Sequence, residues 1–113
     1  MFLHYDDLKR NLDGEMRRLS NFLGIAVNET QWPQLVQAAS FTAMKGAADE
    51  LAPGAHNDEW ASNADFFRMG RMGQWREVLS TDNQVLYEQT WSARLDPAMK
   101  RWMEEGGDCE HRA

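Results

Sequence analysis

The sequence predicts a mostly α-helical chain with a single strand at its N-terminus. Apolar residues recur at helical spacing after Asp13, and capping residues precede several of these stretches. The opening MFLHY is apolar and aromatic, which indicates a short strand that stops at the acidic pair Asp6 and Asp7. A lone strand has unpaired backbone groups at both edges, so we expect its partner strands to lie outside this sequence.

The first helix should begin at Asp13, which can cap it, and end at Gly24. A second helix should start near Thr30, where Pro33 is tolerated because the first turn has no intrahelical N–H partners to lose. A short helical piece at residues 40–47 follows. The inward faces of the first two helices comprise Met16, Leu19, Phe22, Leu23, Trp32, Leu35, Val36 and Ala39.

Residues 48–65 hold many turn formers and little periodicity, so they predict a long, mobile loop. A last long helix should begin at Ser80 or Thr81, and a short helix should follow Asp96 and Pro97. The polar tail, residues 106–113, is expected to be disordered. Most of the tryptophans are expected in the core.

Composition limits the partners that the chain can have. The 113 residues fit one small domain, and a net charge of −6 argues against general attraction to nucleic acid or an anionic membrane. Cys109 is the single cysteine, so no disulfide or thiolate zinc site can form within one chain, and we expect a cytoplasmic protein. No apolar run approaches the roughly 20 residues needed to span a bilayer, and the N-terminus does not resemble a signal peptide.

The segment FFRMGRMGQW, residues 66–75, combines two arginines with two glycines and contains no acidic residue. Glycine lets backbone N–H groups approach an anion, and guanidinium supplies paired donors, so phosphate is a suitable ligand. On composition alone, such a segment is more often an ordinary solvated loop than a phosphate site.

Three segments in order along the chain resemble cytosolic-type sulfotransferases, which use the sulfuryl donor PAPS (3′-phosphoadenosine 5′-phosphosulfate). HYDDLKRNLDGEMRRLSNFLGI resembles the family's Tyr-Glu-Asp-Leu-Lys strand end and the helix after it, and SFTAMKG resembles its Ser-Phe-x-x-Met-Lys segment. FFRMGRMGQWREVLS resembles the family's Arg-Lys-Gly-x-x-Gly-Asp-Trp-Lys loop. The resemblance covers residues 2 to about 87 and implies an α/β fold with a P-loop-type parallel sheet. Residues 1–105 would then be the C-terminal part of that domain.

The resemblance implies a site for the 3′-phosphate and adenine of the nucleotide. Phe41 and Met44 would wall the adenine, and Arg68 with the backbone of Gly70 would hold the 3′-phosphate. Tyr5 would lie at the adenosine end. Plain packing or surface roles stay open for each of these residues. Ser40 is a weaker member of the group, and Gly73 and Trp75 are interpreted as loop scaffold.

Two departures from the family pattern weaken this site. Met69 stands where the family has lysine, and Gln74 stands where it has aspartate. Arg71, further along the loop, is a candidate to supply the missing charge. The family's dimerisation pattern after the tryptophan is not reproduced, so we do not expect that dimer.

The family's phosphosulfate loop, transfer lysine and catalytic histidine have no counterparts in the sequence. The histidines His4, His56 and His111 match no family catalytic position, so no catalytic residue and no metal are assigned. The resemblance therefore implies the nucleotide-binding part of an enzyme that moves a sulfuryl group from PAPS to a hydroxyl or amine of unknown identity. We expect this chain to be inactive alone, with a missing N-terminal half as a candidate partner. The alternatives are a non-catalytic helical interaction module and an autonomous binder of adenosine 3′,5′-bisphosphate.

Overall fold

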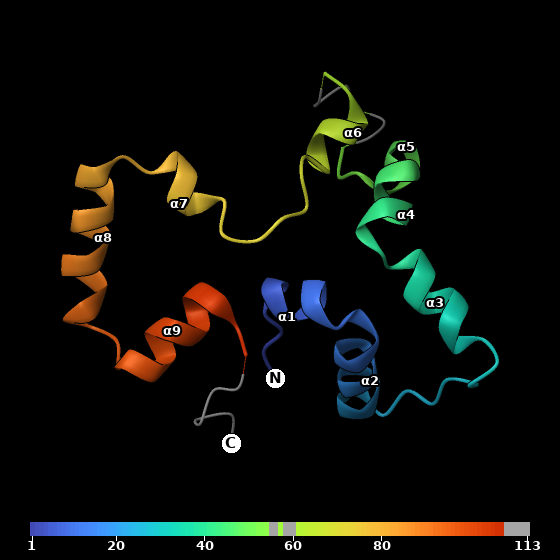
Figure 1. The fold of residues 1–113 in the computed structure, drawn as a ribbon. Helices are drawn as coiled ribbons and strands as arrows, with labels where there is room; N and C mark the ends of the chain where they lie inside the picture. Colours follow the sequence, from blue (N-terminus) through green and yellow to red (C-terminus); the bar gives the residue numbers. More distant parts are fainter. Residues whose placement is uncertain (55–56, 58–60, 108–113) are drawn as a thin grey trace. The chain divides into compact units, whose positions relative to one another are not determined.

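The computed structural model describes residues 1–54, 57 and 61–107. The chain divides into two compact units, one formed by Met1–Asn11 with Arg71–Ala113 and the other by Leu12–Gly70. Helices α1, α7, α8 and α9 belong to the first unit, and α2 to α6 belong to the second (Figure 1). The helices are α1 (Tyr5–Arg10), α2 (Leu12–Leu23), α3 (Trp32–Ala38), α4 (Phe41–Gly46), α5 (Ala48–Leu51), α6 (Asn63–Phe66), α7 (Trp75–Val78), α8 (Thr81–Ser92) and α9 (Pro97–Glu105).

The predicted N-terminal strand is wrong. Within the described ranges no segment is assigned to a strand, and Tyr5 already begins α1. His4 caps this helix, because its Nδ1 accepts a hydrogen bond of 3.1 Å from the amide of Asp6. The acidic pair that was expected to stop a strand instead occupies the first turn of α1, where negative charge is favourable. The parallel sheet implied by the resemblance is therefore not seen in the described part of the chain.

The longer helices begin and end close to where capping residues predicted. At the C-terminus of α2, Gly24 has φ +67°, its amide donates to the carbonyl of Asn21, and the amide of Ile25 donates to the carbonyl of Ser20. This double pairing is a Schellman motif, which satisfies the last carbonyls of a helix. The helices α4, α8 and α9 are capped by the side chains of Ser40, Ser80 and Asp96, respectively.

The predicted long loop is only partly correct. Residues 48–51 form α5 and residues 63–66 form α6. Residues 55, 56 and 58–60 of the stretch that was predicted to be mobile lie outside the described residues. Of the tail predicted to be disordered, residues 106–113, Gly106 caps α9 and the amide of Gly107 donates to Asp7, whereas residues 108–113 lie outside the described residues. Residues 67–74 have no helix, as the glycines of that segment predicted.

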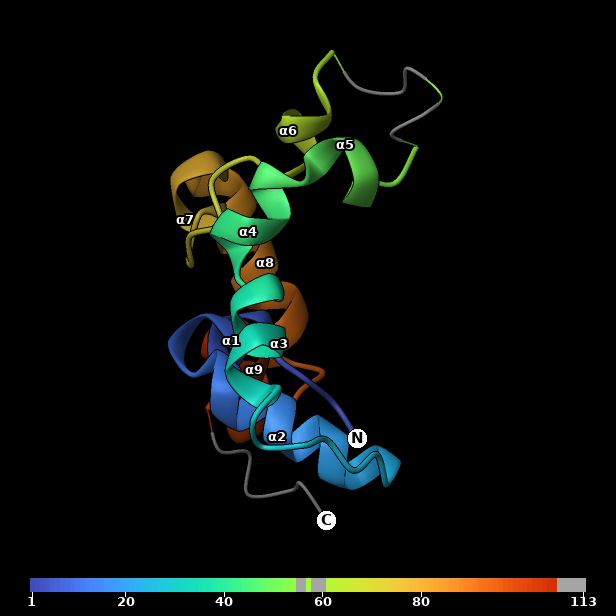
Figure 2. The same cartoon turned by 90° about the vertical axis from the view of Figure 1, so that its right-hand side faces the viewer.

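The core of the second unit lies where α4, α5 and α6 meet. Ala48, Ala52 and Phe67 are buried there, and Phe41 and Met44 pack against them. Figures 1 and 2 both show these three helices gathered together. Short, sequence-adjacent helices thus hold the segment that contains Arg68 and Gly70.

Trp32 forms a separate buried point between α2 and α3. It is 5% exposed, and its indole Nε1 donates to Asp13 Oδ1 over 2.5 Å. The Arg17 guanidinium lies 4.5 Å from the centre of the ring and also binds both carboxylate oxygens of Glu29, at 2.8 and 2.9 Å. The expectation that most tryptophans lie in the core is fully met by Trp32. Trp75, Trp91 and Trp102 are only half-buried.

Candidate functional site

The helix α4 presents the two residues predicted to wall the adenine. Ser40 Oγ accepts a hydrogen bond of 3.2 Å from the amide of Ala43, which starts the helix directly before Phe41. Phe41 and Met44 are three residues apart and lie on the same side of the helix. Both are half-buried against the core, so packing is part of the role of each.

The ring of Phe41 also contacts the predicted phosphate segment. Phe41 and Phe67 meet edge to face, with ring centroids 6.2 Å apart and planes at 76°. Gly70 has φ +59°, and a Cβ built on it would come within 2.7 Å of three atoms of the Phe41 ring. The structure therefore brings together two segments that lie 29 positions apart, and only glycine fits at their contact.

A lysine that the sequence analysis did not assign joins the same two segments. Lys45 Nζ donates to the backbone carbonyl of Arg68 over 3.0 Å. Lys45 lies in the last turn of α4, at the end of the SFTAMKG motif, and its side chain is exposed. The motif could have pointed to it, since the family pattern includes this lysine.

The Arg68 side chain is exposed to solvent, as is that of Met69. The guanidinium and the positive-φ backbone at Gly70 are thus in one short exposed segment, a combination that suits a phosphate. Ser40, Phe41, Met44, Arg68 and Gly70 all belong to the second unit. Five of the six predicted site residues therefore lie on neighbouring elements of one unit.

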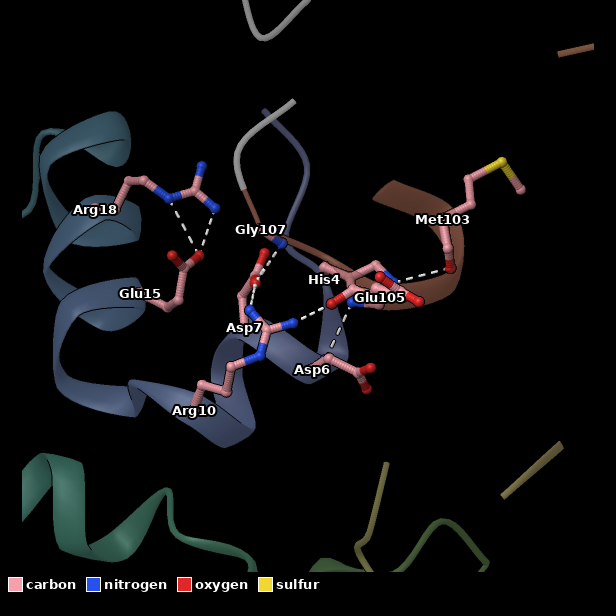
Figure 3. Close-up of polar contacts among 9 residues, drawn as sticks. All are labelled: His4, Asp6, Asp7, Arg10, Glu15, Arg18, Met103, Glu105 and Gly107. Atoms are coloured by element: carbon pink, nitrogen blue, oxygen red, sulfur yellow. Dashed lines mark hydrogen bonds and ion pairs between the residues drawn. The ribbon is translucent and has the colours of Figure 1, made fainter. Parts of the chain in front are cut away.

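Tyr5 belongs to the first unit, where it begins α1 and is 49% exposed. Its predicted role at the adenosine end stays a prediction. Around it, α1 is held by residues near the end of α9, as Figure 3 shows. Asp7 is buried, and its Oδ1 accepts from Arg10 Nη1 at 2.8 Å and from the amide of Gly107 at 2.7 Å.

His4 takes part in the same contact between α1 and α9. With Nδ1 accepting from Asp6, its Nε2 carries the proton and donates to the carbonyl of Met103 over 3.0 Å (Figure 3). Arg10 donates to the carbonyl of Glu105. Both nitrogens of the imidazole thus take part in contacts that hold α1 and α9 together, and the absence of a catalytic role for His4 stays a prediction.

The loop after Gly70 is occupied by its own contacts. Arg71 Nη2 pairs with Glu77 at 2.6 Å, and the side-chain amide of Gln74 donates to the carbonyl of Arg71 over 2.7 Å. Trp75 begins α7, packs near the ring of Tyr87 at 5.4 Å between centroids, and lies under the Arg76 guanidinium at 4.5 Å. The expectation that Trp75 is scaffold agrees with this packing. Arg71, the candidate replacement charge, already has a carboxylate partner.

A cluster of charged side chains between α8 and α9 perturbs three titratable groups of the first unit. Burial and a hydrogen bond to Glu104 raise the pKa of Tyr87 above its ordinary value. Burial opposes ionisation of Glu104, but hydrogen bonds from Lys100 and Tyr87 outweigh it and lower the pKa of that carboxyl. Lys100 Nζ lies 2.7 Å from Glu104 Oε1 and 3.0 Å from Glu88 Oε1, which raises the pKa of the ammonium. Because its charges are mutually paired, the cluster serves to join the two helices.

The described residues contain no grouping of three His, Cys, Asp or Glu side chains that could hold a metal ion. None of their helices has the length and apolar character needed to cross a bilayer.

The comparisons with known proteins agree with one another. A family model described as "Sulfotransferase domain" matches residues 1–105. A protein named glycolipid sulfotransferase from Mycobacterium bovis (strain BCG / Pasteur 1173P2) is 33% identical over 103 residues, which is 91% of this chain and 32% of that protein. Human Sulfotransferase 1C2 is 26% identical over 97 residues, covering 85% of this chain and 33% of its own length. Cytosolic sulfotransferase 12 from Arabidopsis thaliana is 28% identical over 81 residues, covering 71% of this chain and 24% of its own length.

The chain spans about a third of the length of the mycobacterial relative and of human Sulfotransferase 1C2. No solved structure matches it.

Proposed function

Because the chain belongs to the sulfotransferase family, we propose that it is the part of a sulfuryl transferase that holds the 3′-phosphate and adenine of PAPS. The observation that carries the proposal is the contact of Gly70 with the Phe41 ring, where a Cβ would come within 2.7 Å. This contact joins the segment proposed for the adenine to the segment proposed for the phosphate. Aromatic and thioether groups suit an adenine face, and an exposed guanidinium suits a phosphate.

The full reaction is proposed for a longer assembly than this chain. Sulfuryl transfer breaks the bond between sulfur and the oxygen of the 5′-phosphate and forms a bond from sulfur to the acceptor oxygen or nitrogen. The acceptor proton goes to a base, and cationic groups stabilise the charge that develops on the oxygens. We assign neither to this chain, so the 113 residues alone should transfer no sulfuryl group.

The acceptor is an open part of the proposal. The mycobacterial relative is named for glycolipids. A glycolipid alcohol therefore belongs in the acceptor panel, together with a phenol and an amine, when the chain is tested in cells or lysates that could supply the rest of the domain. A cytoplasmic location and a soluble protein remain part of the same proposal.

The nucleotide assignment can be tested by NMR titration of the chain with adenosine 3′,5′-bisphosphate, using adenosine 5′-monophosphate as the reference ligand. We expect weak binding that favours the bisphosphate, because a partly formed site supplies few contacts. Arg68→Ala should weaken bisphosphate binding about tenfold, the value of one charge-assisted hydrogen bond. Arg94→Ala, which removes an exposed guanidinium after α8, is the control and should change nothing. Equal affinity for the two nucleotides would refute the assignment of this site to the 3′-phosphate.

A non-catalytic interaction module remains the second candidate, and one observation favours it. An open groove of about 390 Å³ lies between α2 and α3 and is lined almost wholly by apolar side chains. Leu23 and Leu35 line it and are 56% and 43% exposed. Apolar surface of this kind marks contact sites. If no nucleotide binds and the chain is recovered from a native source with a stoichiometric protein partner on this groove, the second candidate becomes the better one.

A further inference from the structure

Lys45 lies beside the backbone of the segment proposed for the 3′-phosphate. Its Nζ donates to the carbonyl of Arg68 at 3.0 Å, from the last turn of a helix 23 residues away. The side chain is exposed, so the ammonium can meet a ligand from solvent. Phe41, one turn earlier on the same helix, contacts Gly70. A residue at each end of α4 therefore contacts the segment from Arg68 to Gly70.

The ammonium of Lys45 has donors to spare. A lysine carries three N–H donors, and the Arg68 carbonyl accepts one of them. In the described part of the chain no carboxylate forms an ion pair with Lys45, whereas Arg71 pairs with Glu77 at 2.6 Å. A phosphate could therefore bind Lys45 without displacing an existing ionic partner, which is not true of Arg71.

We propose that Lys45 is the second cationic ligand of the 3′-phosphate and supplies the charge that Met69 lacks. The inference rests on the proposed function, because it assumes that the nucleotide's 3′-phosphate binds at Arg68 and Gly70. A compact ammonium that is fixed at the Arg68 carbonyl adds a point charge at the backbone of the residue that carries the guanidinium. The charge comes from α4 and so does not depend on the residue at position 69.

A purely structural role for Lys45 makes a different prediction. If Lys45 only ties α4 to residue 68, its loss weakens binding of every ligand of the site to the same degree. If it contacts the phosphate, its loss weakens only ligands that carry the 3′-phosphate, and this effect shrinks as ionic strength rises. The ratio of the affinities for adenosine 3′,5′-bisphosphate and adenosine 5′-monophosphate separates the two roles.

The first experiment titrates the parent chain, Lys45→Met, Lys45→Arg and Arg94→Met with both nucleotides at low and high salt. Methionine keeps the length and apolar stem of lysine while removing the charge. We expect Lys45→Met to weaken bisphosphate binding about tenfold at low salt and to leave monophosphate binding unchanged. Lys45→Arg should retain most of the preference for the bisphosphate. Arg94→Met removes a cation from the first unit and should have no effect.

The second experiment needs no variant for its main measurement. The chain has three lysines, Lys9, Lys45 and Lys100, so reductive methylation with a ¹³C label gives few NMR signals while keeping each positive charge. The Lys45 methyl signal, assigned with Lys45→Arg, should shift with adenosine 3′,5′-bisphosphate and stay in place with the monophosphate. The Lys100 signal is an internal reference, since that ammonium is held by Glu104 and Glu88.

The outcomes distinguish this inference from the proposed function. If the parent prefers the bisphosphate and Arg68→Ala abolishes that preference, but Lys45→Met and the Lys45 methyl signal show no response, only the Lys45 inference is overturned. It is also overturned if Lys45→Met weakens both nucleotides equally. If the parent binds the two nucleotides alike, the proposed function falls together with the inference.

Discussion

Gly70 lies where any side chain would collide with the ring of Phe41, and its φ of +59° strains other residues. Gly70→Ala should therefore cost the conformational penalty of about 1–2 kcal/mol and, in addition, the displacement of the ring. We expect a lower thermal midpoint and a shifted Phe41 ring signal by NMR.

Gly24→Ala is the matched control for Gly70→Ala. Gly24 has φ +67°, and a Cβ there meets nothing within 4 Å, so only the conformational penalty applies. The difference between the two variants measures the ring contact, and Phe41→Ala combined with Gly70→Ala should reduce that difference. Equal destabilisation by the two glycine variants would show that Phe41 does not press on residue 70.

Glu104 provides a pH-dependent prediction in the first unit. Its folded pKa lies below the ordinary value of 4.5, so its contribution to stability is present above that pH and is lost as pH falls through the lower folded value. Glu104→Gln should lower the free energy of unfolding at neutral pH, and the difference from the parent should narrow in more acidic solution. Urea unfolding at several pH values measures this. A difference in unfolding free energy between Glu104→Gln and the parent that stays constant down to acidic pH would contradict this prediction.

At the residue scale, the resemblance supplied Phe41 and Gly70, and the structure brings them into contact. Their contact could not be derived from the sequence, because 29 positions of helix and loop separate them. Lys45 lies within the SFTAMKG motif, but the motif does not show what Lys45 contacts. Its hydrogen bond goes to a backbone carbonyl, which no residue type in the sequence identifies.

At the scale of the helices, two serine caps allow the effect of a cap on stability to be distinguished from its effect on nucleotide binding. Ser40 and Ser80 each accept a hydrogen bond from the amide three residues later and begin α4 and α8, respectively. Ser40→Ala and Ser80→Ala should each destabilise the protein by about 0.5–2 kcal/mol. Only Ser40→Ala should also weaken binding of adenosine 3′,5′-bisphosphate, because α4 carries Phe41 and Lys45. Similar effects of both variants on nucleotide binding would argue against a site at α4.

A capping residue was the most reliable signal for a helix end in the sequence. The helices α8 and α9 begin after the side-chain caps Ser80 and Asp96, and α2 ends directly before Gly24. The prediction failed at the N-terminus for a physical reason. MFLHY has strand-like composition, but the described residues offer it no neighbouring strand, and His4 can cap a helix that the following acidic residues favour.

The short helices α5 and α6 were not predicted from the sequence, for a different reason. Four residues make about one turn, which is too short to display a period of 3.6 residues. Ser62 caps α6 through the amide of Ala64, but it lies in a stretch rich in turn formers, where such a residue predicts a turn equally well.

For the molecule as a whole, very little of the described chain is buried. Trp32, Ala48, Ala52, Phe67 and Asp7 are the only buried residues in the ranges that the structure describes. A domain normally hides far more of its apolar side chains. The groove between α2 and α3 is the clearest part of this exposed apolar surface.

The exposed groove should bind a hydrophobic fluorescent dye. Replacing Leu23 and Leu35 by serine should reduce dye fluorescence while changing the unfolding free energy by less than about 0.5 kcal/mol for each site, because both side chains are already exposed. Leu86→Ser is the control, as Leu86 is 62% exposed on α8 and does not line this groove. If the control lowers the fluorescence as much as the double variant, the dye is not bound at the groove.

The hydrogen bond from the amide of Gly107 to Asp7 joins residues that lie 100 positions apart. During synthesis on a ribosome, at about 5–20 residues per second, Asp7 emerges several seconds before Gly107 exists. Residues 12–70 are continuous and can complete their own contacts in that interval, whereas α1 must wait for the end of α9. In a nascent chain stalled before residue 107, the second unit should therefore be folded, whereas the hydrogen bond from the amide of Gly107 to Asp7 cannot yet have formed.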